Sequence, residues 1–272
     1  MDRKATARET LEIMKRGTYE SGTKVIDIST MHRASIDNSR LFTPEQMEML
    51  LADEPKGGQH SKLPAVETVN CSTVDAILQL AGRGIHNPGV LNFASAKNPG
   101  GGFLNGAMAQ EESIAASSGL YHTLTRHPEY YENNRNYPSM IYTNHAIYSP
   151  EVVFFRDGRF ALLEEPVTAS VLTLPAVNMG QVMQKGEDIR AAEEAMFHRM
   201  KLALALFAHM GHRHLVLGAY GCGVFRNDPY KIAAWWKILL EEYFPDHFDG
   251  IVFAVMDRSK KGDCLRAFEE AF

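Results

Sequence analysis

The sequence predicts an α/β fold in which helices cover both faces of a central β-sheet. Short apolar runs with the character of strands alternate along the chain with longer amphipathic segments. Two of these runs, at residues 89–95 and 214–220, lead directly into glycine-rich loops, which is where α/β sheets usually bind ligands. Hydrophobic residues make up 45% of the chain and charged residues 22%, a balance that supports one sizeable core.

The first half of the chain carries clear start and stop signals for its helices. Gly17 is a stop signal, and Thr43 before a proline is typical of a helix start. Ser72 is a good N-cap, with Asp75 three residues later. We expect helices at residues 3–16, from 44 onward and at 72–82. We expect strands at residues 24–28 and 89–95.

The second half continues the alternation. We expect strands at residues 152–155, 169–174, 214–220 and 250–257, and helices at 188–210, at 230–243 and at the C-terminus. Asp228 and Pro229 have the character of an N-cap and a first helical residue. The polar and aromatic residues 127–138 are predicted to be an excursion over the surface, and a role for their tyrosines against a ligand is left open.

Composition and charge argue against several classes of protein. The net charge of −5 argues against nucleic-acid binding driven by bulk electrostatics, but it allows a polyanion held by backbone amides in one cleft. No apolar run approaches the roughly 20 residues of a membrane span, and the charged N-terminal segment is unlike a secretory signal, so we expect no membrane partner. Cys71, Cys222 and Cys264 predict reduced thiols, no disulfide-linked partner and a cytoplasmic location.

The most informative stretch joins a glycine loop to an acidic helix start. Residues 100–102 are three glycines after a predicted strand, and Gln110, Glu111 and Glu112 begin after seven further residues. Glycines let the backbone adopt positive φ and approach a ligand, so that their N–H groups can meet phosphate or ribose oxygens. Each feature alone is more often a turn or a helix-dipole effect. Together they favour a site for a phosphorylated sugar.

A second glycine loop spans residues 218–228 (GAYGCGVFRND). It is either a second ligand contact or an ordinary turn between a strand and a helix, and the pattern leaves both interpretations open. Cys222 lies between two glycines and is expected to pack without a catalytic role. The histidines of residues 209–214 lack a carboxylate or cysteine at ligand spacing, so we expect no metal site.

These motifs resemble one enzyme family. The string NPGGG, followed after seven residues by QEE, is similar to the signature of poly(ADP-ribose) glycohydrolases. The segments ARETLEIMKRGTY, VLNFASAKNPGGG and GAYGCGVFRND are similar to the bacterial branch, in the same order, from about residue 5 to 228. The resemblance implies a single macrodomain-like catalytic domain over residues 1–272. It would have a mixed β-sheet flanked by helices on both faces, with an N-terminal helical extension over about residues 1–60 packed on it.

The resemblance also implies an activity and its residues. The expected reaction is hydrolysis of the ribose–ribose O-glycosidic bonds of poly(ADP-ribose) from chain ends, releasing ADP-ribose without metal or cofactor. The expected partner is poly(ADP-ribose) or an ADP-ribosylated protein. By the family pattern, Glu112 is the catalytic acid and Glu111 accepts hydrogen bonds from ribose hydroxyls. The expected substrate contacts are Ser95, Gly100, Gly101, Gly102, Gln110, Gly221, Cys222, Gly223, Val224 and Phe225.

The physical chemistry of adjacent glutamates favours a mechanism with one acid. Consecutive helical residues point roughly 100° apart, so Glu111 and Glu112 are badly placed to flank a bond as the two carboxylates of most glycosidases do. Glu112 would protonate the leaving ribose oxygen, the substrate's diphosphate would stabilise the oxocarbenium-like centre, and Glu112 would then activate water. The helix dipole favours an ionised carboxyl at this place, whereas a negative neighbour and desolvation disfavour it. The sequence leaves the balance open.

Three other functions stay open on the sequence. A non-catalytic ADP-ribose-binding module would use the same loops, although an intact pair of glutamates counts against it. A hydrolase of mono-ADP-ribose attached to protein or nucleic acid would also have the same loops, and substrate assays would separate it. A phosphosugar-binding protein unrelated to ADP-ribose is the third, and binding of free ADP-ribose would test it.

Overall fold

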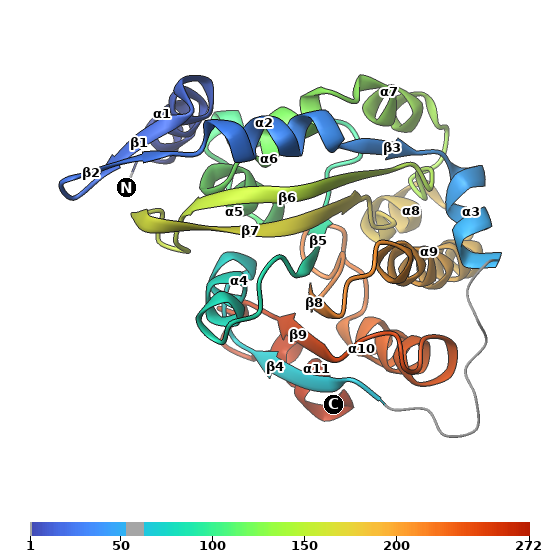
Figure 1. The fold of residues 1–272 in the computed structure, drawn as a ribbon. Coiled ribbons are helices and arrows are strands. Elements are labelled where there is room, and N and C mark those ends of the chain that lie inside the picture. The colour runs from blue at the N-terminus through green and yellow to red at the C-terminus, as the bar shows by residue number, and fades with distance from the viewer. Residues whose placement is uncertain (1, 53–62) are drawn as a thin grey trace.

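A seven-stranded β-sheet lies at the centre of the described part of the chain (Figure 1). The computed structural model describes residues 2–52 and 63–272. The strands of the sheet are β3 (Arg40–Phe42), β4 (Ala65–Val69), β5 (Gly89–Phe93), β6 (Ala146–Arg156), β7 (Leu162–Leu174), β8 (His214–Leu217) and β9 (Gly250–Ala254). Their order is β3-β6-β7-β5-β8-β9-β4, antiparallel from β3 to β7 and parallel from β7 to β4. The predicted mixed sheet is therefore confirmed.

Helices cover both faces of this sheet, and a small hairpin projects from one end (Figure 1). The hairpin pairs β1 (Thr18–Ser21) with β2 (Lys24–Asp27). The helices are α1 (Arg3–Arg16), α2 (Ser29–Asn38), α3 (Pro44–Ala52), α4 (Thr73–Gly82), α5 (Gln110–Ser117), α6 (Leu120–Thr125), α7 (Pro128–Asn136), α8 (Met179–Lys185), α9 (Ile189–His209), α10 (Pro229–Ile238) and α11 (Asp263–Ala271), with a 3-10 turn η1 (Phe103–Asn105) and a π-helical turn η2 (Leu239–Tyr243).

The predicted helix ends are confirmed by their hydrogen bonds. Gly17 ends α1 in the left-handed conformation, at φ 73°, and its N–H donates to the carbonyl of Ile13. The Ser72 hydroxyl caps α4 by accepting from the N–H of Asp75 at 3.0 Å. Asp228 caps α10 in the same way. These side chains bind N–H groups that have no partner inside the helix, which is why they mark helix starts in the sequence.

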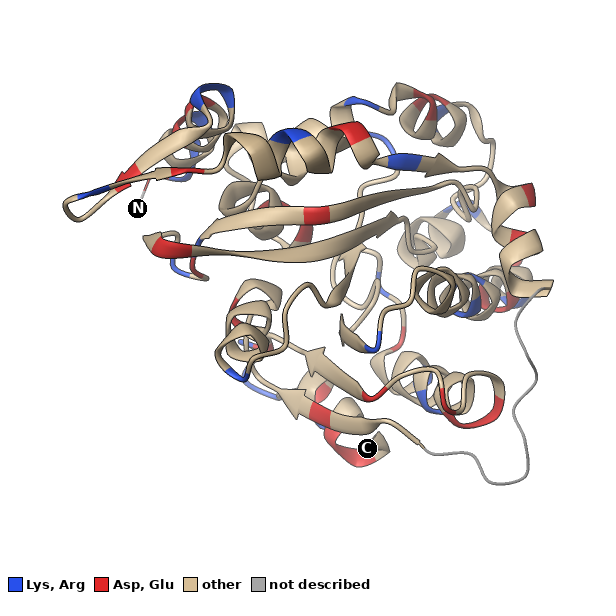
Figure 2. Cartoon of the chain, in the orientation of Figure 1, with Lys and Arg blue, Asp and Glu red and all other residues tan. Residues whose placement is uncertain are grey.

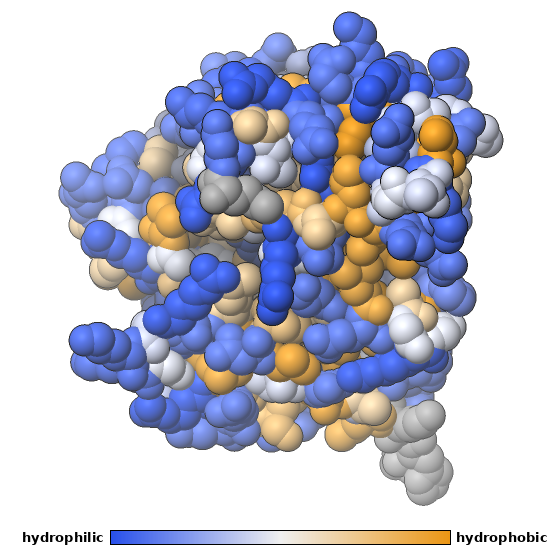
Figure 3. Space-filling model, turned by 90° about the vertical axis from the view of Figure 1, so that its left-hand side faces the viewer, coloured by the Kyte–Doolittle hydropathy of each residue, from blue (hydrophilic) through white to orange (hydrophobic). Residues whose placement is uncertain are grey.

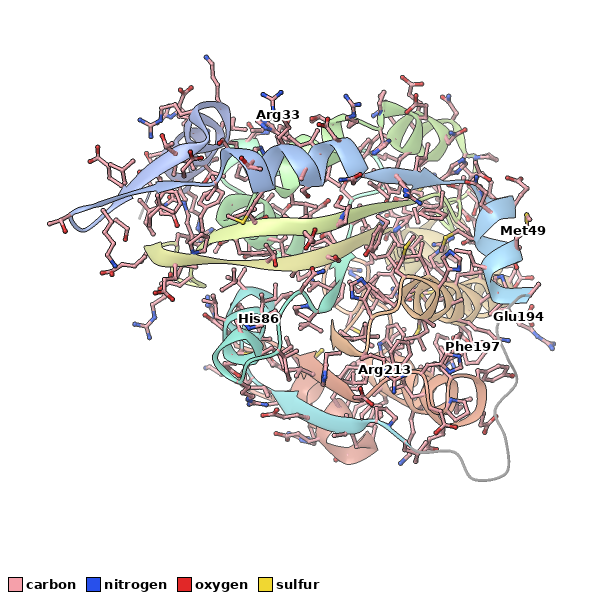
Figure 4. The ribbon with its side chains drawn as sticks, in the orientation of Figure 1. Arg33, Met49, His86, Glu194, Phe197 and Arg213 are labelled. Carbon is pink, nitrogen blue, oxygen red and sulfur yellow. The ribbon has the colours of Figure 1, made fainter. Side chains whose placement is uncertain are left out.

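Alternate residues of the central strands pack into two different cores. Leu91 and Leu215 belong to the core formed with α9 and α10, whereas Val90 and Val216 belong to the core formed with α4, α5 and α6. This alternation follows from the two-residue period of a strand, and it makes both faces of the parallel part apolar. Side chains fill both layers (Figure 4). The rings of Phe197 in α9 and Trp235 in α10 pack edge to face, with centroids 6.0 Å apart.

One predicted surface segment contains a helix with two buried tyrosines. Residues 127–138 contain α7, and its Tyr130 and Tyr131 are 0% and 1% exposed. Their rings pack edge to face, with centroids 4.6 Å apart, in the core beneath α4 to α6. Most other residues of the segment are exposed, so it lies at the surface as predicted. Its inward-facing side was missed because polar neighbours in sequence conceal the apolar area of a tyrosine ring.

The N-terminal segment contributes to the sheet as well as covering it. It supplies α1, α2 and α3, but also β3, an edge strand that pairs with β6. Neither β3, β4 nor α2 was predicted from the sequence. The expected end of the N-terminal extension near residue 60 lies outside the described residues, and the division of the chain there stays a prediction.

Arg199 is a buried cation whose hydrogen bonds go to neutral oxygens. It is 1% exposed, and its guanidinium donates to the carbonyls of Ile141, Pro175 and Tyr142 and to the side chain of Asn144. Among the residues that the structure describes, no carboxylate pairs with it. Arg199 therefore clamps two chain segments together by hydrogen bonds, the segment before β6 and the segment after β7.

We expect Arg199→Met to lower the free energy of unfolding by about 3 kcal/mol, because it leaves three buried carbonyl oxygens without a donor. Urea denaturation followed by circular dichroism measures this loss. Arg190→Met in the same helix is the control, since the Arg190 side chain is 89% exposed and its loss should cost less than about 0.5 kcal/mol. Equal stabilities of the two variants would contradict the clamp.

Candidate active site

The two glycine-rich loops emerge side by side at one edge of the sheet. The first follows β5 and the second follows β8, and these strands are parallel neighbours. The rings of Phe93, at the end of β5, and Tyr220, in the second loop, lie 5.5 Å apart between centroids. Ligands bind at the carboxyl ends of strands in α/β sheets, because the loops there converge. The geometry therefore brings both sequence motifs into one candidate site.

The backbone of the first loop touches both glutamates of the acidic pair. Gly100 and Gly101 have φ angles of +66° and +59°, which residues with a side chain rarely adopt. Gly102 has an ordinary φ of −92°. A Cβ atom on Gly101 would collide with Oε1 of Glu112 and would lie 3.1 Å from Oε2 of Glu111. The absence of a side chain at Gly101 thus lets two carboxyl groups lie against the same peptide.

The N–H groups of the first loop are used within the protein. Gly102 donates to Oε1 of Glu112 at 2.8 Å, Gly101 donates to the carbonyl of Asn98 at 3.0 Å, and the backbone of Gly100 bonds to Glu111. The loop therefore fixes the positions of the two carboxyl groups. The substrate contacts expected of Gly100, Gly101 and Gly102 stay a prediction.

Glu112 is held from two sides and stays partly exposed. Besides the bond from Gly102, its Oε2 accepts from the N–H of Ala109 at 3.0 Å, immediately before α5 begins. The carboxyl therefore joins the glycine loop to the start of its own helix, where it also complements the helix dipole. A carboxyl that is oriented in this way and still reaches solvent is suited to proton transfer.

Glu111 lies in a different environment, since only 3% of it is exposed. Its carboxyl accepts from the N–H of Ser95 at 2.7 Å and from the side-chain amide of Asn92 at 3.3 Å. Burial raises the pKa of Glu111 to about 8, and the nearby charge of Glu112 acts in the same direction. Glu111 is therefore protonated at neutral pH, so it can donate a hydrogen bond as well as accept one.

The Gln110 side chain is held by three hydrogen bonds, and the substrate contact expected of it stays a prediction. Its Oε1 accepts from the N–H of Phe93 at 2.8 Å, and its Nε2 donates to the carbonyl of Leu91 and to the hydroxyl of Thr73. These bonds anchor the start of α5 to the end of β5. Ser95 keeps a free hydroxyl hydrogen, because its Oγ accepts from the next backbone turn. It remains available for a ligand.

The second loop presents unused backbone donors to solvent. Within the described residues, the N–H groups of Gly223, Val224 and Phe225 donate to no atom. Val224 is 82% exposed, and a Cβ on Gly223 would meet nothing within 4 Å. Asn227 holds the base of the loop by donating to the carbonyl of Gly221 at 3.1 Å. Consecutive free N–H groups on a fixed loop are a good place for an anion.

Phe225 and Cys222 lie at the root of this loop. The ring of Phe225 is partly buried and lies 6.2 Å from the ring of Tyr142 between centroids. A hydrogen bond with Cys264 and burial raise the pKa of the Cys222 thiol well above its ordinary value. The raised pKa disfavours the thiolate that a nucleophile needs. The packing role and the substrate contact expected of Cys222 stay predictions.

Comparisons with known proteins identify the family. The family model described as the catalytic domain of microbial-type PARG, the poly(ADP-ribose) glycohydrolases, matches residues 7–157, which is more than half of the chain. The chain belongs to this family. The resemblance drawn from the glycine and Gln-Glu-Glu motifs is confirmed, and so is the predicted class of enzyme, a glycohydrolase. Among curated proteins, no sequence matches the chain.

Solved poly(ADP-ribose) glycohydrolases have the same fold. The enzyme from Thermomonospora curvata is 38% identical, with 99% of each chain covered and a TM-score of 0.94. The same enzyme bound to the inhibitor ADP-HPD has a TM-score of 0.92 at 38% identity, again with 99% of each chain covered. The enzyme from Deinococcus radiodurans in complex with ADP-ribose is 41% identical, with a TM-score of 0.82 over 88% of this chain and 96% of that chain.

Two features of this glycohydrolase site were missed in the sequence. Asn92, inside β5, is 0% exposed and bridges Glu111 to the hydroxyl of Thr173, to which it donates at 3.1 Å. An asparagine within an otherwise apolar strand was an available signal, since a buried amide needs partners. The buried Tyr130 and Tyr131 lie close enough to interact electrostatically with Glu111, and no pattern in the sequence placed them there.

In residues 2–52 and 63–272, no three side chains of His, Cys, Asp or Glu gather as metal ligands do. Over the same residues, no helix is both long and apolar enough to cross a membrane.

The raised pKa of Glu111 predicts a pH-dependent stability. The folded protein loses this proton only around pH 8, whereas the unfolded chain loses it near the ordinary glutamate pKa of 4.5. The unfolded chain then binds fewer protons, so this contribution to the free energy of unfolding falls between these pH values, by a few kcal/mol, and levels off above them. Urea denaturation at several pH values should therefore give a flatter profile for Glu111→Gln than for wild type. Glu132→Gln, at an exposed site, should keep the wild-type profile, and parallel profiles for all three would contradict the prediction.

Proposed function

We propose that the chain hydrolyses the ribose–ribose O-glycosidic bonds of poly(ADP-ribose), with Glu112 as the catalytic acid. The observation that carries this proposal is the position of Glu112, partly exposed and held by two backbone N–H groups where both glycine loops emerge. The relatives solved with ADP-ribose and with the inhibitor ADP-HPD support a nucleotide sugar as the ligand.

The loops divide the binding of ADP-ribose between them. The free N–H groups of Gly223, Val224 and Phe225 suit the diphosphate, because converging donors stabilise anionic oxygens. The predicted contact between the Phe225 ring and the distal ribose fits the place of that ring beside this loop. The glycines at 100 and 101 let the loop backbone lie against both carboxyls, and the distal ribose binds beside this loop. Glu111, protonated at neutral pH, can bond a ribose hydroxyl as donor or acceptor.

The reaction then needs one proton donor and one water molecule. Glu112 gives a proton to the ribose oxygen that links two units, and the bond from this oxygen to the anomeric carbon breaks. The anomeric carbon becomes oxocarbenium-like, and the substrate's own diphosphate stabilises its positive charge. Water adds to this carbon and returns a proton to Glu112, so the acid is regenerated. Most glycosidases use a second carboxylate as nucleophile or base. Glu111 is unsuited to that role, since it is buried and bears a proton.

Attack from chain ends and a cytoplasmic location complete the proposal. Attack from ends yields free ADP-ribose as the main product, whereas attack within chains yields oligomers. The location is supported by the cysteines, because Cys71, Cys222 and Cys264 are all free thiols.

Incubation with auto-modified poly(ADP-ribose), followed by chromatography of the released products, tests the activity. Free ADP-ribose as the main early product is expected. Oligomers as the main early product would contradict attack from ends, and release of mono-ADP-ribose from protein with the polymer intact would favour the alternative linkage. Tight binding of ADP-ribose without hydrolysis of either substrate would identify a binding module.

Glu112→Gln should lower turnover of poly(ADP-ribose) about 10²-fold to 10⁴-fold, because a general acid acts mainly in the transition state. The affinity for ADP-ribose, measured by calorimetry, should change little. Glu132→Gln removes an exposed carboxyl on α7 and is the matched control, with turnover like that of wild type. Hydrolysis by Glu112→Gln at the wild-type rate would remove Glu112 from its role.

Gly223→Val tests the second loop more cleanly than a change in the first. A valine at Gly101 would push both carboxyls aside, whereas a Cβ atom at Gly223 would meet no protein atom within 4 Å. We therefore expect Gly223→Val to unfold at the wild-type urea concentration and to bind ADP-ribose at least tenfold more weakly, because the new side chain blocks the free N–H groups. Gly82→Val, equally unhindered at the end of α4, should bind like wild type. Equal affinities of the two variants would exclude the loop from binding.

A further inference from the structure

A shallow hollow adjoins Glu112 on the side of the first helix. Its walls come from the start of α1, from the loop around η1 and from α5, with Arg3, Thr6, Phe103, Met108 and Glu112 among them. The hollow thus shares the catalytic carboxyl and α5 with the site described above, but it is also lined by α1, which the proposed binding of ADP-ribose does not use. It extends the site toward the N-terminus of the chain.

The first turn of α1 lies directly on the loop that holds Glu112. A Cβ atom on Gly106, which has φ +77°, would lie 3.3 Å from Cβ of Arg3 and 3.2 Å from Cγ of Lys4. Gly106 belongs to the same turn as Gly102, whose carbonyl accepts from the N–H of Ala107 at 3.1 Å. The side chains of Arg3 and Lys4 therefore start close to the loop whose Gly102 N–H orients the catalytic acid.

The stability of the helix does not account for these two cations. A helix dipole disfavours positive charge in the first turn, and the first turn of α1 contains no acidic residue. Asp2 precedes it as the N-cap, with its carboxylate bound to the N–H groups of Lys4 and Ala5. Both basic side chains are exposed, and in the described part of the chain neither forms an ion pair. Basic residues are visible along α1 in Figure 2, and mostly hydrophilic side chains project from the side of the molecule seen in Figure 3.

The chemistry of the polymer places an anion next to this position. The oxygen that Glu112 protonates belongs to the adenosine ribose of the neighbouring unit, and the same ribose carries that unit's diphosphate. The leaving side of the bond therefore brings two phosphates close to the acid, outside the loops that bind the first unit. We propose that Arg3 and Lys4 form a subsite for the diphosphate of the leaving ADP-ribose unit, with the exposed Met108 as an apolar wall for its base. This inference rests on the proposed function.

Two substrates separate the subsite from the catalytic site. One is poly(ADP-ribose), and the other is ADP-ribose joined at the same anomeric carbon to a small uncharged aryl alcohol, which has no phosphate on its leaving side. For Arg3→Glu we expect kcat/KM for the polymer, relative to the aryl substrate, to fall about tenfold, since an attraction becomes a repulsion. Raising the salt concentration should lower this difference. A folding defect is no alternative, because an acidic residue in the first turn stabilises the helix.

The matched control is Arg16→Glu, at the exposed far end of α1, which makes the same change of charge on the same helix. Its ratio of the two kcat/KM values should stay within twofold of wild type. An equal fall for Arg3→Glu and Arg16→Glu would show a general attraction of the polyanion and overturn the subsite. A fall of equal size on both substrates, or no change, would overturn it as well. Failure of the wild-type chain to hydrolyse either substrate would instead overturn the proposed function, and the subsite with it.

Discussion

The hydrogen bonds between one glycine loop and two adjacent carboxyls are the constraint on which the site depends. Gly102 binds Glu112, the backbone of Gly100 binds Glu111, and Gly101 has no side chain to keep the carboxyls away. The loop and the helix start therefore hold each other in place. Any change in the position of the loop must also move the acid, so binding of the sugar and proton transfer are coupled through the same few atoms.

Burial gives the two glutamates different properties although they are neighbours in sequence. Glu111 lies beneath Ser95, with Asn92 and two tyrosines around it, and loses contact with water. Glu112, one residue later, points to the junction of loop and helix and stays partly exposed. One fold thereby produces a neutral carboxyl that can orient a hydroxyl and an oriented carboxyl that can reach a glycosidic oxygen. Two ionised carboxylates that lie against the same glycine would repel each other.

The parts of the fold with local signals were predictable from the sequence, and the parts held by partners were not. Helix caps such as Gly17, Ser72 and Asp228 act within a few residues, so the sequence shows them directly. The edge strands β3 and β4 have only 3 and 5 residues and become strands because β6 and β9 lie beside them. The helix α7 was missed for a similar reason, since a core far away in sequence accepts its tyrosine rings.

The sequence by itself determined the family, the alternation of strands and helices, and the identity of the acidic pair, because each of these is written in neighbouring residues. Only the tertiary structure decided which N–H groups are free. In the first loop, Gly102 donates to Glu112 and Gly101 to the carbonyl of Asn98, whereas the N–H groups of Gly223 to Phe225 donate to no described residue. It also decided that Gln110 anchors a strand and that α1 lies on the loop of the catalytic acid. Hydrogen-bond partners and burial depend on chain segments distant in sequence, so residue patterns alone cannot assign them.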